Sequence, residues 1–535
     1  MKQSAIVAPQ PDAVETGAII LKEGGNAVDA AIACAFVQTV VDPLMCGIAG
    51  FGSMQLYLPD QDIHEFIDFH GKAPAAAKPD MWQDLIIGET NDGFGFLLDG
   101  KINDLGHQSI TVPGSLKAFY EAHSRFGVLP WKRVIEPAIA FARNGYILSA
   151  EVYYYWISRD APGRTSVADR LCYSAPGREI YCDPSGQPKP LGNIIKNPDM
   201  ADTLSLIAEQ GSDIFYHGDI AASIDTDMRA NGGLLSAQDL ANYETQSMEP
   251  LWGAYRGYSF ATNHPPGGGI MLVEMLNILE NFDLKALGHN APEYIRVVTE
   301  AMKIATVDKD DHVGDPNFVD IPVDRLTGKA YGKKQADGIR RGDIKHVERL
   351  GIPESQKTTH ISVLDHAGNA VSMTHSLGMM SGVITDGLGF MYNGCMGVFD
   401  PRPGHAGSIA PGKSRFSSVC PTILFDGGKP ALIIGAPGGT QIAIGVLQVI
   451  LNVVDFAMPI DQAIREPRFS ATSDVIDVSP RIPRYVYAPL ETSGYEFRRS
   501  PYSYDFASVH AIQVKDGQVS GAADIPYGGG MALVF

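Results

Sequence analysis

The sequence has 535 residues, of which 45% are hydrophobic and 19% are charged. This length and composition fit one large domain or two ordinary ones, and they exclude a chain dominated by disorder. The formal net charge of −19 argues against binding to the phosphate backbone of a nucleic acid. A small anionic substrate is compatible with it, because one local basic group can override the mean field.

The six cysteines form no metal-binding or redox pattern, since the sequence contains no CxxC pair. The spacing of Cys172 and Cys182 would allow them to pair, but so few cysteines make no disulfide scaffold, and we expect free thiols. No signal peptide is recognised at the N-terminus, and no apolar stretch reaches about 18 residues. We therefore expect a soluble, cytoplasmic protein with no membrane contact.

The first strong element is residues 25–41, which are rich in alanine and apolar on nearly all sides. Such a helix is buried between layers rather than exposed on a surface, and Asn26 is a plausible N-cap. Residues 101–250 alternate helical pieces with Pro/Gly breaks. Two further long helices are predicted over residues 269–281 and 292–307.

The pattern changes near residue 354. Strands are predicted over 360–364 and 370–376, joined by the turn sequence DHAGN, so that they form a hairpin beginning beside Thr358. A strand over 430–435 then passes through APGG into an apolar helix at 440–454, and the tail predicts two more strands. Strands and helices that mix without regular βαβ alternation favour an α+β fold, with sheets packed face to face and helices outside.

Recognisable motifs follow one another along nearly the whole chain. Among them are GGNAVDAAIACAFVQTVVDP at 24–43, GIAGFGSMQLYL at 47–58, IDFHGKAP at 67–74, PPGGGIMLVEMLNILENFDL at 265–284, GDPNFV at 314–319, TTHISVLDHAGNAVSMTHSL at 358–377, SRFSSVCPTI at 414–423, GAPGGTQ at 435–441 and EPRFS at 466–470. In this order they resemble the γ-glutamyltranspeptidase family of N-terminal nucleophile hydrolases. The resemblance implies a four-layer αββα sandwich.

The resemblance also implies a proenzyme that cuts itself once, between Lys357 and Thr358. The products would be a large subunit of residues 1–357 and a small subunit of residues 358–535. The two would remain together as a heterodimer that shares one αββα core. Further oligomerisation is left open.

Thr358 is the expected nucleophile. A threonine at a new N-terminus carries its own base, because its α-amine can accept the hydroxyl proton. The alternative is an ordinary strand threonine, a residue type that sheets favour. Ser376 matches a family threonine whose hydroxyl contacts the nucleophile, although it also fits a polar strand end.

Gly438 and Gly439 are the expected oxyanion hole. Two residues without side chains between a strand and a helix let backbone N–H groups converge on a developing negative charge, although a tight turn would also need glycine. Ser417 and Ser418 match the paired serines with which the family holds a substrate carboxylate, and Arg415 could support the same anion. Adjacent serines in a loop also occur as plain turn residues.

Several positions depart from the family pattern. His70 stands where the family has the arginine that binds the α-carboxylate of a γ-glutamyl group, and Lys72 is an alternative cation. The positions that bind the α-amino group correspond to Gly378, Cys395 and Val398, none of which offers a strong acceptor. We therefore expect an acyl group other than γ-glutamyl, with Cys395 among the residues that line its pocket.

The predicted function is hydrolysis of a small amide, or acyl transfer from it, through a Thr358 acyl-enzyme. Three other activities stay open: a true glutathione hydrolase or γ-glutamyltransferase, an amidase for small acids such as oxamate, and cleavage of a C–C bond. An inactive processed scaffold is a further alternative. No metal or organic cofactor is predicted, because the sequence has no HExxH or P-loop motif and GGGI at 267–270 lacks a Rossmann context.

Overall fold

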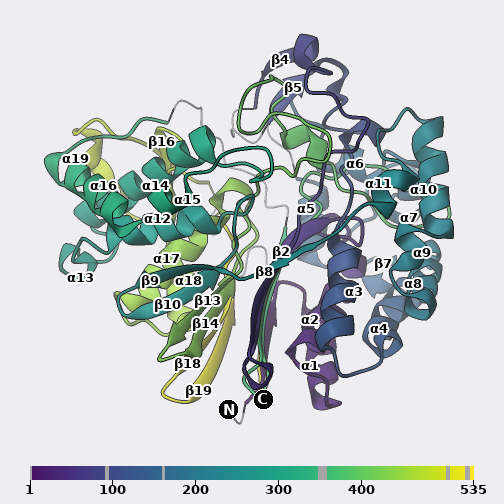
Figure 1. Ribbon diagram of the computed structural model, residues 1–535, viewed down its shortest axis with the longest axis horizontal. Coiled ribbons are helices and arrows are strands. Elements are labelled where there is room, and N and C mark those ends of the chain that lie inside the picture. Colours follow the sequence, from purple (N-terminus) through teal and green to yellow (C-terminus); the bar gives the residue numbers. More distant parts are fainter. Residues whose placement is uncertain (1–2, 91–94, 159–162, 348–357, 502–505, 525–529) are drawn as a thin grey trace.

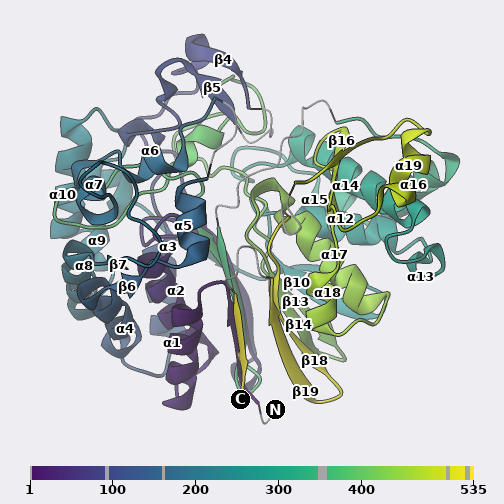
Figure 2. The same ribbon diagram turned by 180° about the vertical axis from the view of Figure 1, so that it is seen from behind.

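The computed structural model describes residues 3–90, 95–158, 163–347, 358–501, 506–524 and 530–535. Two sheets stand side by side at the centre, and helices cover the outer face of each (Figures 1 and 2). The first sheet has seven strands in the order β20-β1-β11-β12-β2-β3-β8, and the second has six in the order β19-β18-β14-β13-β10-β9. The predicted four-layer αββα sandwich is confirmed.

The first sheet is antiparallel throughout its described strands. Its strands are β1 (Ala5–Ala8), β2 (Phe51–Leu58), β3 (Ile63–Phe69), β8 (Gln246–Met248), β11 (Thr359–Leu364), β12 (Ala370–Ser376) and β20 (Met531–Val534). On its side lie the helices α1 (Pro11–Lys22), α2 (Ala27–Val41), α3 (Ser115–Phe126), α4 (Trp131–Asn144), α5 (Ala150–Trp156), α6 (Val167–Leu171), α7 (Ala175–Tyr181), α8 (Pro198–Gln210), α9 (Asp213–Tyr216), α10 (Asp219–Ala230) and α11 (Ala237–Ala241).

The second sheet is antiparallel as well. Its strands are β9 (Leu251–Tyr255), β10 (Tyr258–Thr262), β13 (Thr422–Asp426), β14 (Lys429–Gly435), β18 (His510–Lys515) and β19 (Gln518–Ala523). Its outer side carries α12 (Gly269–Leu279), α13 (Leu284–Leu287), α14 (Pro292–His312), α15 (Val323–Leu326), α16 (Lys329–Arg341), α17 (Ile442–Val454), α18 (Ile460–Arg465) and α19 (Arg484–Glu491). Three small sheets use β4 (Ile86–Glu89), β5 (Phe96–Leu98), β6 (Tyr146–Ile147), β7 (Ile194–Ile195), β15 (Phe469–Ser470), β16 (Val475–Val478) and β17 (Glu496–Arg499).

Helix α2 shows why the sequence folds into layers. All of its 15 residues are buried, as the apolar composition predicts. Asn26 caps it: its side chain accepts the N–H groups of Val28 and Asp29, and Asp29 accepts the N–H of Asn26. This capping box satisfies the first backbone donors of a helix that water cannot reach.

The predicted hairpin of β11 and β12 is confirmed, and other elements differ from expectation at their ends. Helix α17 begins at Ile442, since Gly439–Gln441 form a 3₁₀ turn before it. Helix α14 continues to His312, five residues beyond its predicted end. The described tail holds three strands, not two, because β20 crosses to the first sheet and pairs with β1.

Each large sheet contains strands from before and after residue 357. In the first sheet β11 and β12 lie between β1 and β2, and in the second sheet β13 pairs with β10. The two ends of the chain meet as well, because Ser4 and Phe535 exchange backbone hydrogen bonds of 2.8 and 2.9 Å. Neither part therefore holds a complete sheet.

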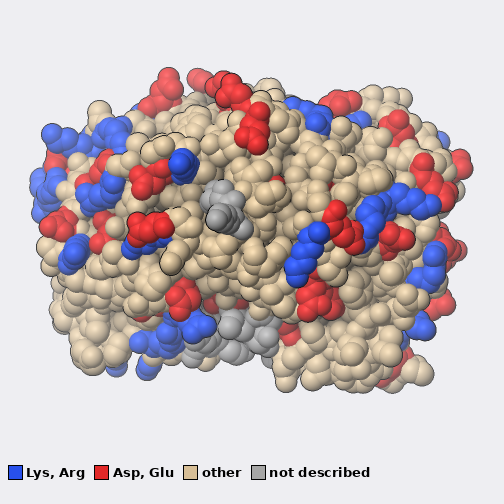
Figure 3. Space-filling model, turned by 90° about the horizontal axis from the view of Figure 1, so that it is seen from below, with Lys and Arg blue, Asp and Glu red and all other residues tan. Residues whose placement is uncertain are grey.

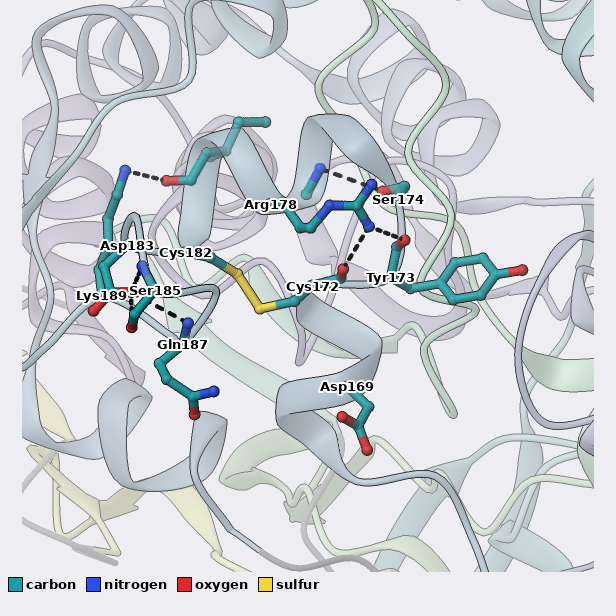
Figure 4. The surroundings of a disulfide bond; sticks show 12 residues. Asp169, Cys172, Tyr173, Ser174, Arg178, Cys182, Asp183, Ser185, Gln187 and Lys189 are labelled. Atoms are coloured by element: carbon teal, nitrogen blue, oxygen red, sulfur yellow. Dashed lines mark hydrogen bonds between the residues drawn. A yellow bond between two sulfur atoms is a disulfide. The ribbon is translucent and has the colours of Figure 1, made fainter.

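The expectation of free thiols at Cys172 and Cys182 is wrong, because these cysteines form a disulfide (Figure 4). They end the short helices α6 and α7, and the turn between the helices brings their Cα atoms to 6.4 Å. Arg178 fixes this turn by donating to the carbonyls of Cys172 and Tyr173. Ten residues of separation alone do not reveal such a turn. The other cysteines (Cys34, Cys46, Cys395 and Cys420) are free and buried.

The surface carries charges of both signs. On the face shown in Figure 3, acidic and basic side chains are interspersed among uncharged ones. Within the described part of the chain, no helix combines the length and apolar character needed to cross a membrane.

Candidate active site

The central hairpin brings Thr358 and Ser376 together. Thr358 directly precedes β11 and is 6% exposed, and Ser376 is the last residue of β12. Because Thr359 pairs with His375 across the hairpin, the next residues outward meet, and Thr358 Oγ1 lies 3.1 Å from Ser376 Oγ. Ser376 Oγ also accepts the N–H of Gly378 at 2.7 Å. The hydroxyl pair expected from the sequence is thus present as a buried contact.

The facing sheet places a glycine turn beside Thr358. Ser362 Oγ donates to the Ile433 carbonyl, and a Cβ at Gly435 would lie 2.2 Å from the His360 ring. The two strands therefore run in opposite directions with His360 opposite Gly435. Extended by two residues, this register puts Thr358 opposite Pro437, the residue before the Gly438–Gly439 pair.

Glycine is required in this turn for two reasons. Gly438 and Gly439 have φ values of 145° and 54°, which L side chains rarely adopt. A Cβ at Gly438 would also lie 2.5 Å from the Cβ of Ala507. The 3₁₀ turn that follows leads into α17, so the glycines lie at the positive end of a helix dipole.

Arg415 is a buried cation that lies beside Gly378. It is 5% exposed, and its guanidinium carbon lies 4.8 Å from the centre of the Phe51 ring. A Cβ at Gly378 would be 3.2 Å from Arg415 Nη2 and 2.8 Å from Cys395 Sγ. Burial raises the pKa of the Cys395 thiol, although Arg415 opposes the shift. Gly378, Cys395 and Arg415 thus lie against one another and form one wall, and none of these three residues offers a carboxylate or amide to an ammonium group.

His70 lies behind Phe51, with 5.7 Å between their ring centres. It is 1% exposed, and its Nδ1 contacts the carboxylate of Asp68. Its Nε2 has no hydrogen-bond partner among the described residues. The Tyr243 hydroxyl donates to the His70 carbonyl at 2.9 Å. His70 is thus near the expected pocket, and Phe51 contacts both His70 and Arg415.

Lys72 does not join the site. Its Nζ donates to the Glu244 carbonyl at 3.1 Å and lies 5.1 Å from the centre of the Tyr243 ring. Lys72 is therefore engaged elsewhere, whereas Arg415 lies beside Gly378.

A pocket opens next to the glycine turn. Its lining includes Arg415, Ser418 and Thr440, together with Lys309 and the carboxylates of Asp310 and Asp400. Ser417 contributes less directly, because its hydroxyl accepts the N–H of Val419 and its own N–H donates to the Pro266 carbonyl. Ser418 thus lines the pocket, whereas Ser417 holds the loop in place.

Sequence reasoning missed a buried charge cluster beside the site. Arg164 donates to the sulfur of Met379, the neighbour of Gly378, and lies 3.8 Å from Asp104. Burial raises the pKa of Asp104, but Arg170 and Arg164 outweigh it and lower that pKa to about 2. These residues come from separate loops and helices, and no local pattern in the sequence connects them.

The sequence matches the family described as gamma-glutamyltranspeptidase over residues 13–534. It is 36% identical to the acylase ACY 1 proenzyme of Pseudomonas sp. (strain V22), covering 97% of this chain and 91% of that protein. It is 34% identical to the glutathione hydrolase proenzyme of Escherichia coli (strain K12), covering 98% of this chain and 90% of that protein.

Solved structures agree with these matches. Cephalosporin acylase from Bacillus halodurans has a TM-score of 0.87 and 26% identity, covering 99% of this chain and 96% of that one. Helicobacter pylori gamma-glutamyltranspeptidase has a TM-score of 0.55 and 32% identity, covering 62% of this chain and 89% of that one. The chain belongs to the gamma-glutamyltranspeptidase family of N-terminal nucleophile hydrolases, and it is an enzyme of the hydrolase or acyltransferase type.

Proposed function

We propose that the protein cuts itself after Lys357 and then cleaves a small amide, or transfers its acyl group, through an acyl-enzyme on Thr358. The buried contact of 3.1 Å between the hydroxyls of Thr358 and Ser376 is the observation that carries this proposal. Lys357 lies outside the described residues. Relatives named proenzymes support the processing step.

Self-cleavage needs only the Thr358 hydroxyl and one water. The hydroxyl oxygen attacks the Lys357 carbonyl carbon, so that a C–O bond forms while the C–N bond breaks. Water then hydrolyses this ester, leaving a carboxylate on Lys357 and a free α-amine on Thr358. Because each of the two large sheets contains strands from both products, residues 1–357 and 358–535 would stay together as a heterodimer.

In turnover the same hydroxyl attacks the acyl carbon of the substrate and passes its proton to the Thr358 amine. The amine returns that proton to the leaving nitrogen, and water or another amine releases the acyl group. The N–H groups of Gly438 and Gly439 are proposed to stabilise the tetrahedral oxyanion. Since Ser376 Oγ accepts from the Gly378 N–H, its own proton is suited to support the oxygen of Thr358.

The pocket favours an acyl group with a terminal carboxylate and no α-ammonium. Arg415 and Ser418 offer donors to a carboxylate, whereas the two carboxylates of the lining, Asp310 and Asp400, already contact Lys309 and Arg402. Val398 in the lining and Gly378 beside Arg415 offer no side-chain acceptor to an ammonium. An ammonium buried there without a partner would be costly. The relatives named acylases support this choice, whereas those named glutathione hydrolases support the second candidate, a γ-glutamyl donor.

The cytoplasmic location expected from the sequence is at odds with one feature. Disulfides such as Cys172–Cys182 persist mainly in oxidising compartments. We therefore favour an oxidising compartment over the cytoplasm.

The first prediction concerns Thr358. Intact-mass spectrometry of the purified wild type should show two pieces, residues 1–357 and 358–535, and N-terminal sequencing of the second should begin Thr-Thr-His. Thr358→Ala should stay full length and inactive because it lacks the hydroxyl, while Thr358→Ser should keep part of both activities. A Thr358→Ala protein that is cleaved or turns over substrate would assign the nucleophile to another residue.

The second prediction concerns the glycine turn. Gly439→Val should lower the turnover rate on the order of 10²-fold, because one oxyanion donor is displaced. Gly427→Val is the matched control: Gly427 has the same φ of 54° but lies in the turn between β13 and β14, at the far end of β14. Equal losses of rate in the two variants would show that backbone strain, not oxyanion binding, is responsible.

The third prediction concerns the substrate. Glutaryl-p-nitroanilide should be cleaved about 10³-fold more efficiently than γ-glutamyl-p-nitroanilide, because the ammonium of the second loses two or more charge-assisted hydrogen bonds. Arg415→Met should remove most of the preference for the glutaryl over the uncharged valeryl compound. Arg340→Met, which removes an arginine stacked on Phe282 far from the site, is the control. Efficient turnover of the γ-glutamyl compound alone would favour a glutathione hydrolase.

A further inference from the structure

One buried glutamine contacts the neighbours of both hydroxyl residues at the proposed active site. Gln38 lies near the end of α2 and has no solvent exposure. Its Nε2 donates to Thr359 Oγ1 at 2.9 Å, and its Oε1 lies 2.8 Å from His375 Nε2. Thr359 follows Thr358 in the chain, and His375 precedes Ser376. A single side-chain amide thus joins the two strand ends that carry the Thr358–Ser376 contact.

The orientation of this amide is fixed by a chain of buried groups. Gln10 Nε2 donates to the carboxylate of Asp42 at 2.8 Å, so the Oε1 of Gln10 faces the other way. That oxygen accepts from Gln38 Nε2 at 2.7 Å, which leaves Gln38 Oε1 directed at His375. Because an amide oxygen can only accept, His375 must carry its proton on Nε2.

His375 meets this requirement as a neutral ring. Burial lowers its pKa to about 3, so a single ring nitrogen carries a proton near neutral pH. The bond to Gln38 therefore sets both the tautomer and the orientation of the residue that precedes Ser376. Buried polar groups linked in this way hold one another's geometry, because losing one partner leaves others unpaired.

The Gln38 bridge lies next to the new chain end that the proposed cleavage would create at the start of β11. Thr359 and His375 are the last residues paired in the ladder of β11 and β12. After cleavage Thr358 becomes the end of a chain, and chain ends fray unless they are tied down. Gln38 ties down the residue next to it from a helix that is itself wholly buried.

We propose that Gln38 is a positioning residue, which holds the cleaved end of β11 against β12 so that Thr358 stays within reach of Ser376. This inference rests on the proposed role of Thr358 as the nucleophile. Gln38 itself touches neither the substrate nor the reacting atoms. Its loss should therefore slow the chemical steps without changing how the substrate binds.

The test compares Gln38→Met with Gln448→Met. Gln448 is a matched control, because it is a buried glutamine on α17 whose amide bonds to both backbone groups of Phe469, away from Thr358. Gln38→Met should slow self-cleavage and lower kcat for glutaryl-p-nitroanilide by about 10²-fold, with KM unchanged, because the reacting groups are misplaced. Gln448→Met should lower the melting temperature comparably and leave both rates unchanged.

A second variant serves if Gln38→Met does not fold. Gln38→Glu keeps the shape and the acceptor for His375 but loses the donors to Thr359 and Gln10, so its kcat should fall by less. Wild-type self-cleavage and kcat in a folded Gln38 variant would overturn the inference, as would an equal loss in Gln448→Met. If Thr358→Ala is inactive while the Gln38 variants are fully active, the positioning role fails and the proposed function stands; activity in Thr358→Ala overturns the function itself.

Discussion

The site depends on one hairpin that is buried on both faces. The described residues of β11 and β12 are all buried: α2 packs on one side, and on the other Ser362 and Ser372 donate to carbonyls of β14. A slip of one residue would turn every side chain to the wrong layer, so the register is strongly specified. The same register brings Thr358 to Ser376 within its own sheet and, when extended beyond β14, directs it toward Pro437, which precedes the Gly438–Gly439 turn of the facing sheet. The register of this hairpin is therefore needed both for the fold and for the proposed chemistry.

Much of this architecture could be predicted, because its signals are local. The composition of α2, the cap at Asn26 and the turn between β11 and β12 are each written in short stretches of sequence. What escaped prediction depends on contacts between distant segments. The stacking of Arg415 on Phe51, the return of β20 to the first sheet and the amide bridge of Gln38 join residues with no common local pattern. The 3₁₀ turn before α17 and the positive φ values of Gly438 and Gly439 are not revealed by an apolar pattern.

The proposed substrate follows from the charged groups that the wall of Gly378, Cys395 and Arg415 can pair with. Arg415 supplies a guanidinium held over an aromatic ring, a setting in which arginine keeps its charge and its fork of donors. Gly378 and Cys395 face the same space without an acceptor strong enough for an ammonium. His70 lies near the wall but pairs with Asp68, so it does not simply replace the arginine of the family pattern. One family can thus accept different acyl groups while the nucleophile and its glycine turn stay in place.

The central claim, an acyl-enzyme on Thr358, is tested most directly by isolating the intermediate. Protein mixed with glutaryl-p-nitroanilide would be quenched in acid during turnover, digested and examined by mass spectrometry. The account predicts a glutaryl ester on the peptide that begins at Thr358, appearing with the first release of p-nitroaniline and sensitive to hydroxylamine. A glutaryl group on another residue, such as Ser376 or Cys395, or turnover in which no adduct forms at all, would contradict it.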